Sequence, residues 1–124
     1  MKKIAAGAVV ILLFATMLFA APKGKTQTFT GEIMDSQCAA MGSHSQMLKK
    51  EGMADKDPND AMAKTMCTHN CVKMGGKYVL FNAADKSVYE LDDQTKPEKF
   101  AGANVKVKGT LEGNTIHVKS ITKA

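Results

Sequence analysis

The clearest hydrophobic pattern in the first third of the chain is an alternation over residues 26–34. Phe29 and Ile33 fall on one side of an extended chain, and Glu32 falls on the other. A two-residue period is typical of a strand with one buried face and one wet face. This segment therefore predicts a first strand in which Glu32 faces solvent.

The same alternation returns near the end of the chain. Val105 and Val107 alternate with lysines, and the Gly113-Asn114 pair favours a tight turn into a partner strand. Two shorter apolar runs lie between the two alternating regions. In chain order, the predicted elements are strands at 26–34, 77–82, 87–91, 105–112 and 115–119, with a short helical turn at 97–102 before the fourth strand.

Residues 35–76 interrupt this strand pattern and predict two helices. Ser43 begins a capping-box motif for a short helix that stops at Gly52. Asp57-Pro58 supplies a cap and a first-turn proline for a second helix, which runs to Met74. The order of elements predicts a mainly β fold, a five-stranded OB-like barrel that carries a two-helix insertion between its first and second strands. A small roll or sandwich with the same strands is the alternative.

Residues 1–20 match a secretory signal peptide. Lys2 and Lys3 precede an unbroken run of apolar and small residues, and Ala20 is suited to cleavage. The run is short for a transmembrane helix of about 20 residues, so we expect no membrane span after processing. The expected organisation is a signal peptide at 1–20, a flexible lead-in at 21–25 and an OB-like domain at 26–124, in a periplasmic or secreted protein.

The charge pattern argues against a nucleic-acid partner. The formal net charge is +5, and all of the positive side chains counted in it are lysines, because the sequence contains no arginine. Proteins that read nucleic acids usually employ arginine forks and a clustered basic face. The lysines near the C-terminus stand at alternate strand positions, which fits a solvated edge that resists aggregation.

Three cysteines and one histidine carry the candidate chemistry. Cys67 and Cys71 are four residues apart on the second predicted helix, so their side chains share one face. Cys38 follows the first strand, and His44 lies in the first turn of the first predicted helix. We expect these four residues to form a closed Cys₃His site for Zn²⁺, with Cu(I) as the alternative ion. His69 projects away from Cys67 on the same helix and is not expected to join them.

The segment that holds the cysteines is also rich in methionine. Because methionine fills irregular apolar gaps, packing accounts for most of these side chains. Met62 and Met66 stand one helical turn apart and are expected to contact the barrel, whereas Met41 and Met47 are candidate extra ligands for copper. The methionines of the segment are Met34, Met41, Met47, Met53, Met62, Met66 and Met74.

A disulfide is the main alternative to a metal, because exported thiols tend to be oxidised. A bond from Cys38 to either helical cysteine would close a loop of about 30 residues and stabilise the domain by about 3 kcal/mol. On this alternative the chain is a disulfide-stapled OB-like interaction module that binds a protein or an envelope polymer. A redox enzyme would need an exposed thiol with a low pKa. The leading hypothesis is a non-enzymatic domain that binds a soft metal ion.

Several of these residues form motifs that occur together in a known group of proteins. The string from Gly31 to Cys38 contains Asp-Ser-x-Cys, and residues 67–71 form a Cys-x-x-x-Cys pair. Residues 76–79 read Gly-Lys-Tyr-Val, and residues 109–111 read Gly-Thr-Leu. Over residues 28–122 the chain resembles an uncharacterised family of small secreted bacterial proteins with an OB-like strand set. The resemblance implies export and a shared architecture, but no reaction.

Overall fold

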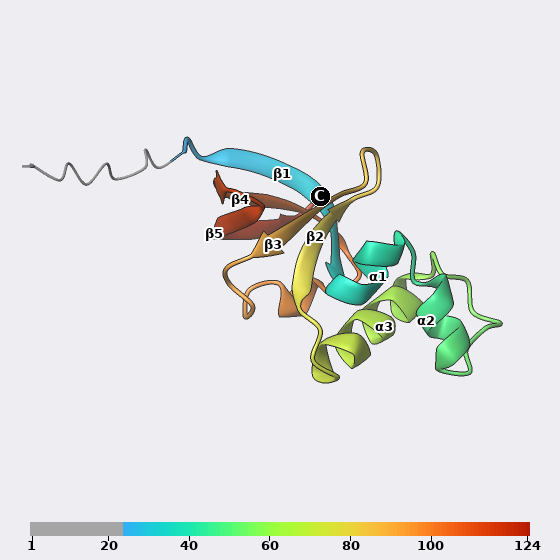
Figure 1. Cartoon of the computed structure of the whole chain (residues 1–124). Helices are drawn as coiled ribbons and strands as arrows, with labels where there is room; N and C mark the ends of the chain where they lie inside the picture. Colours follow the sequence, from blue (N-terminus) through green and yellow to red (C-terminus); the bar gives the residue numbers. More distant parts are fainter. Residues whose placement is uncertain (1–23) are drawn as a thin grey trace, which may run out of the picture.

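The computed structural model describes residues 24–124 (Figure 1). The predicted signal peptide and residues 21–23 of the lead-in lie outside this range. None of the helices in residues 24–124 is long and apolar enough to cross a membrane. The described elements are, in order, β1 (Gln27–Asp35), α1 (Ser36–Met41), α2 (Ser45–Lys50), α3 (Ala61–Lys73), β2 (Tyr78–Asn82), β3 (Ser87–Leu91), the 3-10 helix η1 (Glu98–Phe100), β4 (Asn104–Glu112) and β5 (Thr115–Lys123).

The strands form one sheet that closes into a ring in the order β1-β2-β3-β5-β4. The long strand β1 closes the ring, because its first part pairs with β4 and its last part pairs with β2, both in antiparallel fashion. A short parallel contact joins β3 to β5 on the other side. The five strands lie where the alternation placed them, although β5 continues to Lys123. The prediction of a mainly β fold with helices between β1 and β2 is confirmed.

The three helices gather at one end of the ring, against β1 and β2 (Figure 1). They create a second apolar core outside the ring. The inner core of the ring contains Ile33, Leu80 and Val105, whereas the core between the ring and the helices contains Met34 and Val79. Successive residues of β1 point alternately into these two cores, so both faces of its C-terminal half are buried.

The burial of both faces corrects the prediction for Glu32. Its side chain was expected to face solvent, but the residue is only 8% exposed. Alternation in sequence reveals which residues share a face, but it does not reveal that α3 covers the outer face of β1. A buried carboxylate needs partners, and Glu32 has two of them, His44 and Lys64.

The helical insertion contains three helices rather than the two predicted. The additional helix, α1, is too short to show a hydrophobic period, and it begins directly after Asp35. The start of α3 also differs from the prediction, because its N-cap is Asp60, whose carboxylate accepts from the backbone N–H of Ala63. Asp57 instead closes a turn with the N–H of Asn59, so the Asp57-Pro58 pair precedes the helix without starting it.

The expected contact of Met62 and Met66 with the barrel is wrong. Met62 is 72% exposed and Met66 is 43% exposed. The face of α3 that packs inward instead carries Ala63, Cys67 and Cys71. The small side chains of that face let the helix approach the strands closely, and the bulkier methionines point to solvent.

Candidate metal centre

Asp35 links the end of β1 to the start of α1. Its Oδ1 atom accepts hydrogen bonds from the backbone N–H groups of Gln37 (3.0 Å) and Cys38 (2.8 Å), which makes it the N-cap of α1. This cap fixes where α1 begins, and so it fixes the direction in which the Cys38 side chain points. Asp35 is fully buried, and its second oxygen, Oδ2, has no hydrogen-bond partner. A buried carboxylate oxygen without a partner is costly unless something else satisfies it.

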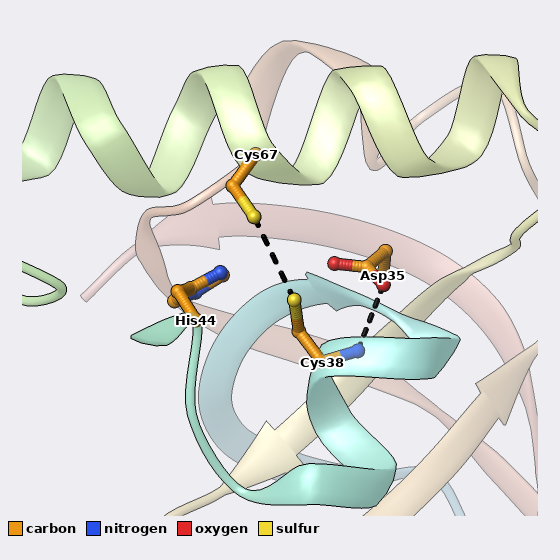
Figure 2. A group of neighbouring side chains, drawn as sticks. All are labelled: Asp35, Cys38, His44 and Cys67. Atoms are coloured by element: carbon orange, nitrogen blue, oxygen red, sulfur yellow. Dashed lines mark hydrogen bonds between the residues drawn. The ribbon is translucent and has the colours of Figure 1, made fainter. Parts of the chain in front are cut away.

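Cys38 and Cys67 face each other from α1 and α3 (Figure 2). Their Sγ atoms are 3.6 Å apart, and both residues are 0% exposed. The two cysteines are free thiols separated by 29 positions in the chain. Figure 2 shows Asp35 and His44 on either side of the two sulfur atoms.

His44 precedes α2 and is 3% exposed. Its Nε2 atom lies 2.8 Å from Glu32 Oε2, and Glu32 Oε1 lies 2.6 Å from Lys64 Nζ. Burial alone would raise the pKa of Glu32, but the hydrogen bonds from His44 and Lys64 outweigh it and lower that pKa below its ordinary value. In the tautomer in which Nε2 donates to Glu32, Nδ1 has a free lone pair. Nδ1 is buried and has no partner within the described residues.

Asp35, Cys38, His44 and Cys67 together form a group that could hold a metal ion. One ligand atom of each residue lies within 4.8 Å of the ligand atoms of the other three, and all four residues are buried. Of the four buried side-chain nitrogen and oxygen atoms that lack a partner in residues 24–124, two belong to members of this group. The arrangement offers two sulfurs, one nitrogen and one oxygen, with a carboxylate behind the histidine as is usual for metal-ligating imidazoles.

Three of the four residues proposed from the sequence, Cys38, His44 and Cys67, meet in this group. Cys71 lies outside the group, although it is also 0% exposed and occupies the next turn of α3. Asp35 was missed as a ligand because only cysteine, histidine and methionine side chains were considered. The signal was present in the chemistry, since a carboxylate has two oxygens and the cap employs only one.

The remaining histidines lie away from the thiols, and the two candidate copper ligands differ in their burial. His69 Nδ1 is 2.9 Å from the hydroxyl of Tyr78, away from the thiols, as helix geometry required. His117 is exposed and pairs with two surface carboxylates. Met47 is 5% exposed and packs in the same core as the thiols, whereas Met41 is 37% exposed.

All three thiols are hard to ionise without a metal. Burial, followed by the neighbouring Asp35 carboxylate, raises the pKa of Cys38 far above its ordinary value. The same two causes raise the pKa of Cys71 to about 12, and burial raises the pKa of Cys67. A thiol reacts as a nucleophile only in its thiolate form, so burial makes these cysteines poor nucleophiles.

The comparison with known protein families gives one match. A family model described as "Protein of unknown function (DUF5818)" matches residues 71–124, which span the last part of the insertion and strands β2–β5. The matched region contains Cys71 but none of Asp35, Cys38, His44 and Cys67. No curated protein and no solved structure matches the chain.

Proposed function

We propose that this chain is an exported, non-enzymatic domain that binds one Zn²⁺ ion through Asp35, Cys38, His44 and Cys67. The observation that carries the proposal is the position of two unsatisfied polar atoms, Asp35 Oδ2 and His44 Nδ1, on members of the same buried group as two thiols. Buried polar atoms are nearly always paired. A cation bound at the centre of the group would satisfy both atoms at once.

The spacing of the sulfurs supports a shared ion. Two thiolates that bind one tetrahedral zinc ion at about 2.3 Å each lie about 3.8 Å apart. The Sγ atoms of Cys38 and Cys67 are 3.6 Å apart. All four ligand atoms of the group lie within 4.8 Å of one another. Zinc binding would therefore need only a small inward movement of the nitrogen and oxygen ligands.

The donor set favours zinc over copper. Zn²⁺ binds thiolate, imidazole and carboxylate ligands together, and four protein ligands are typical of structural zinc sites. Cu(I) prefers soft sulfur donors and gains little from a carboxylate. A set in which Asp35 supplies the fourth ligand therefore suits Zn²⁺ best.

The surroundings of the group support a structural role. A cavity of about 520 Å³ borders His44, Glu32 and Lys64, but Asp35, Cys38 and Cys67 do not line it. A zinc ion with four protein ligands has no open position for a substrate or a water molecule. The ion would instead join the end of β1 to all three helices. It would thereby hold the insertion against the ring.

The architecture and the destination of the chain form part of the same proposal. The strand order β1-β2-β3-β5-β4, with β1 pairing on both sides, supports an OB-like barrel, a fold that is built from five strands. Export rests on the signal-peptide features of residues 1–20. A metal site in an oxidising compartment would also protect the two thiols from oxidation.

A second candidate function remains the disulfide-stapled interaction module for a protein or an envelope polymer. The contact between Cys38 and Cys67 favours this pair over any bond within α3. Such a bond would close a loop of about 30 residues, worth about 3 kcal/mol. The stapled domain would leave Asp35 Oδ2 and His44 Nδ1 without partners, which is why zinc is the better account.

An anaerobic competition titration of the reduced mature protein with a chromophoric zinc chelator tests the proposal. We expect one Zn²⁺ ion per chain, with an affinity that competes with the chelator. The intact mass of the protein taken directly from the exporting compartment separates the two candidates, because a disulfide lowers the mass by about 2 Da. Failure to take up zinc when all three thiols are reduced would reject the proposal.

Zinc binding is expected to release about two protons. Burial raises the pKa of Cys38 and Cys67, so both thiols carry protons near neutral pH until the metal displaces them. The apparent affinity should therefore rise about a hundredfold per pH unit between about pH 6 and 8. Calorimetry in buffers of different ionisation enthalpy measures the number of protons. A value near zero would contradict ligation by neutral, buried thiols.

Glu32→Gln is expected to weaken zinc binding by about ten- to a hundredfold, because loss of the carboxylate charge weakens the hold on His44. The substitution keeps the size of the side chain and leaves all four ligands in place. Glu98→Gln, at an exposed position, removes the same charge and serves as the control. Equal affinities of the two variants would show that Glu32 does not orient His44.

A further inference from the structure

Cys71 is a buried thiol that the zinc group leaves unused. It follows Cys67 by one turn on the inward face of α3 and is 0% exposed. After burial itself, the Asp35 carboxylate and the Cys67 thiol contribute most to the raised pKa of Cys71. Cys71 therefore adjoins the zinc group without belonging to it.

The surroundings of the three thiols are unusually rich in sulfur. The core between the ring and the helices contains Cys38, Cys67 and Cys71 together with two buried methionines and one partly buried methionine, Met34, Met47 and Met53. Thiolate and thioether sulfurs are the ligands that select Cu(I). The composition of this core thus suits a softer ion than the one that Asp35 and His44 favour.

We propose that Cys38, Cys67 and Cys71 form a second ligand set, selective for Cu(I), that shares two thiols with the zinc group. The inference extends the proposed function, since both ions would occupy one centre and exclude each other. Three thiolates around one ion at about 2.3 Å lie about 4.0 Å apart, close to the 3.6 Å between Cys38 and Cys67. Rotation of Cys71 between staggered side-chain conformers moves its sulfur by about 3 Å. In the copper-bound form, such a rotation would exchange Asp35 for a third sulfur.

The surface at the C-terminal end of α3 offers a route for a soft ion. A shallow hollow there is lined by Met53 and Met74, together with Glu51 and two further residues of α3. Met74 is 64% exposed and follows Cys71 by three residues. Thioethers at the surface can hold Cu(I) weakly, and thiolates bind it more strongly. The hollow therefore places two thioethers at the end of α3 that also carries Cys71.

Two parallel titrations of the mature protein test the inference under anaerobic and reducing conditions. Cu(I) is supplied as its bicinchoninate complex, and Zn²⁺ is supplied with a chromophoric chelator. Cys71→Ser is expected to weaken Cu(I) binding by about a hundredfold and zinc binding by less than about threefold. Asp35→Asn should do the reverse, because asparagine still caps α1 through its side-chain oxygen but is a poor zinc ligand.

The two proposals fail in different ways. Cu(I) binding by Cys71→Ser at the affinity of the natural protein would overturn the second ligand set, whatever the zinc titration shows. Absence of zinc binding in the natural protein would instead overturn the zinc proposal. Circular dichroism of each metal-free variant verifies folding, and Cys71→Ala replaces Cys71→Ser if the serine variant does not fold. Sulfur-only coordination in the copper X-ray absorption spectrum is the expected result, and nitrogen or oxygen ligands would contradict it.

Discussion

Cys67→Ser is expected to weaken zinc binding by about a hundredfold or more. A structural zinc site contributes about 10–16 kcal/mol over four ligands, so one ligand accounts for roughly 3 kcal/mol. Each 1.4 kcal/mol corresponds to about a tenfold change in affinity. The loss should appear in the competition titration as failure to withdraw zinc from a chelator that the natural protein outcompetes.

Cys71→Ser is the matched control for this substitution. It makes the same chemical change on the same face of the same helix, and both cysteines are 0% exposed. Only Cys67 belongs to the zinc group. Equal losses in the two variants would mean that the thiols serve packing or a third ligand arrangement. An unchanged affinity in Cys67→Ser would remove the site altogether.

Removal of zinc is expected to lower the melting temperature by about 15–30 °C. A ligand present at about a thousand times its dissociation constant stabilises the folded state by about 4 kcal/mol. For a domain of about 100 residues, each kcal/mol shifts the melting temperature by about 4–8 °C. Calorimetry of the reduced protein with zinc and then with excess chelator measures the difference.

The same experiment distinguishes the two candidate functions. A domain stapled by a Cys38–Cys67 disulfide should melt at the same temperature with and without chelator, and should lose stability when a reductant is added. A zinc domain should respond to the chelator and be stable in reductant. Insensitivity to the chelator in the reduced protein would contradict the zinc account.

Much of the ring could be predicted from the sequence because the relevant signals are local. Alternation of side chains located β1 and the β4–β5 hairpin, and the Gly113-Asn114 pair located the turn between them. Helices between β1 and β2 were also predicted, but neither begins at its predicted cap. The N-cap of α2 is His44 rather than Ser43, and the N-cap of α3 is Asp60 rather than Asp57. The short helix α1 escaped because six residues are too few for a helical period.

The errors about burial involve contacts between segments that are distant in sequence. Glu32 is buried because α3 covers it, and Met62 is exposed because α3 presents its cysteine face to the strands. Neither fact follows from the pattern within one element. The composition of the candidate site was only partly predictable, because it also depends on contacts between distant segments. Helical spacing showed that Cys67 and Cys71 share a face, but not which of them reaches Cys38.

Asp35 illustrates a different limit. It caps α1 in the structure, a helix that the sequence did not predict. Its candidacy as a ligand emerged only when Oδ2 proved to be buried without a partner beside two thiols and an imidazole. Unsatisfied polar atoms are a property of the folded protein, and they point to ligands that no motif records.

Zinc X-ray absorption spectroscopy of the protein, purified from the exporting compartment without added metal, reports the metal and its ligands together. We expect one zinc ion per chain with two sulfur ligands at about 2.3 Å and two nitrogen or oxygen ligands at about 2.0–2.1 Å. A spectrum with three or more sulfur ligands would contradict the assignment of Asp35 and His44. Protein that holds no zinc while its thiols are reduced would contradict the account as a whole.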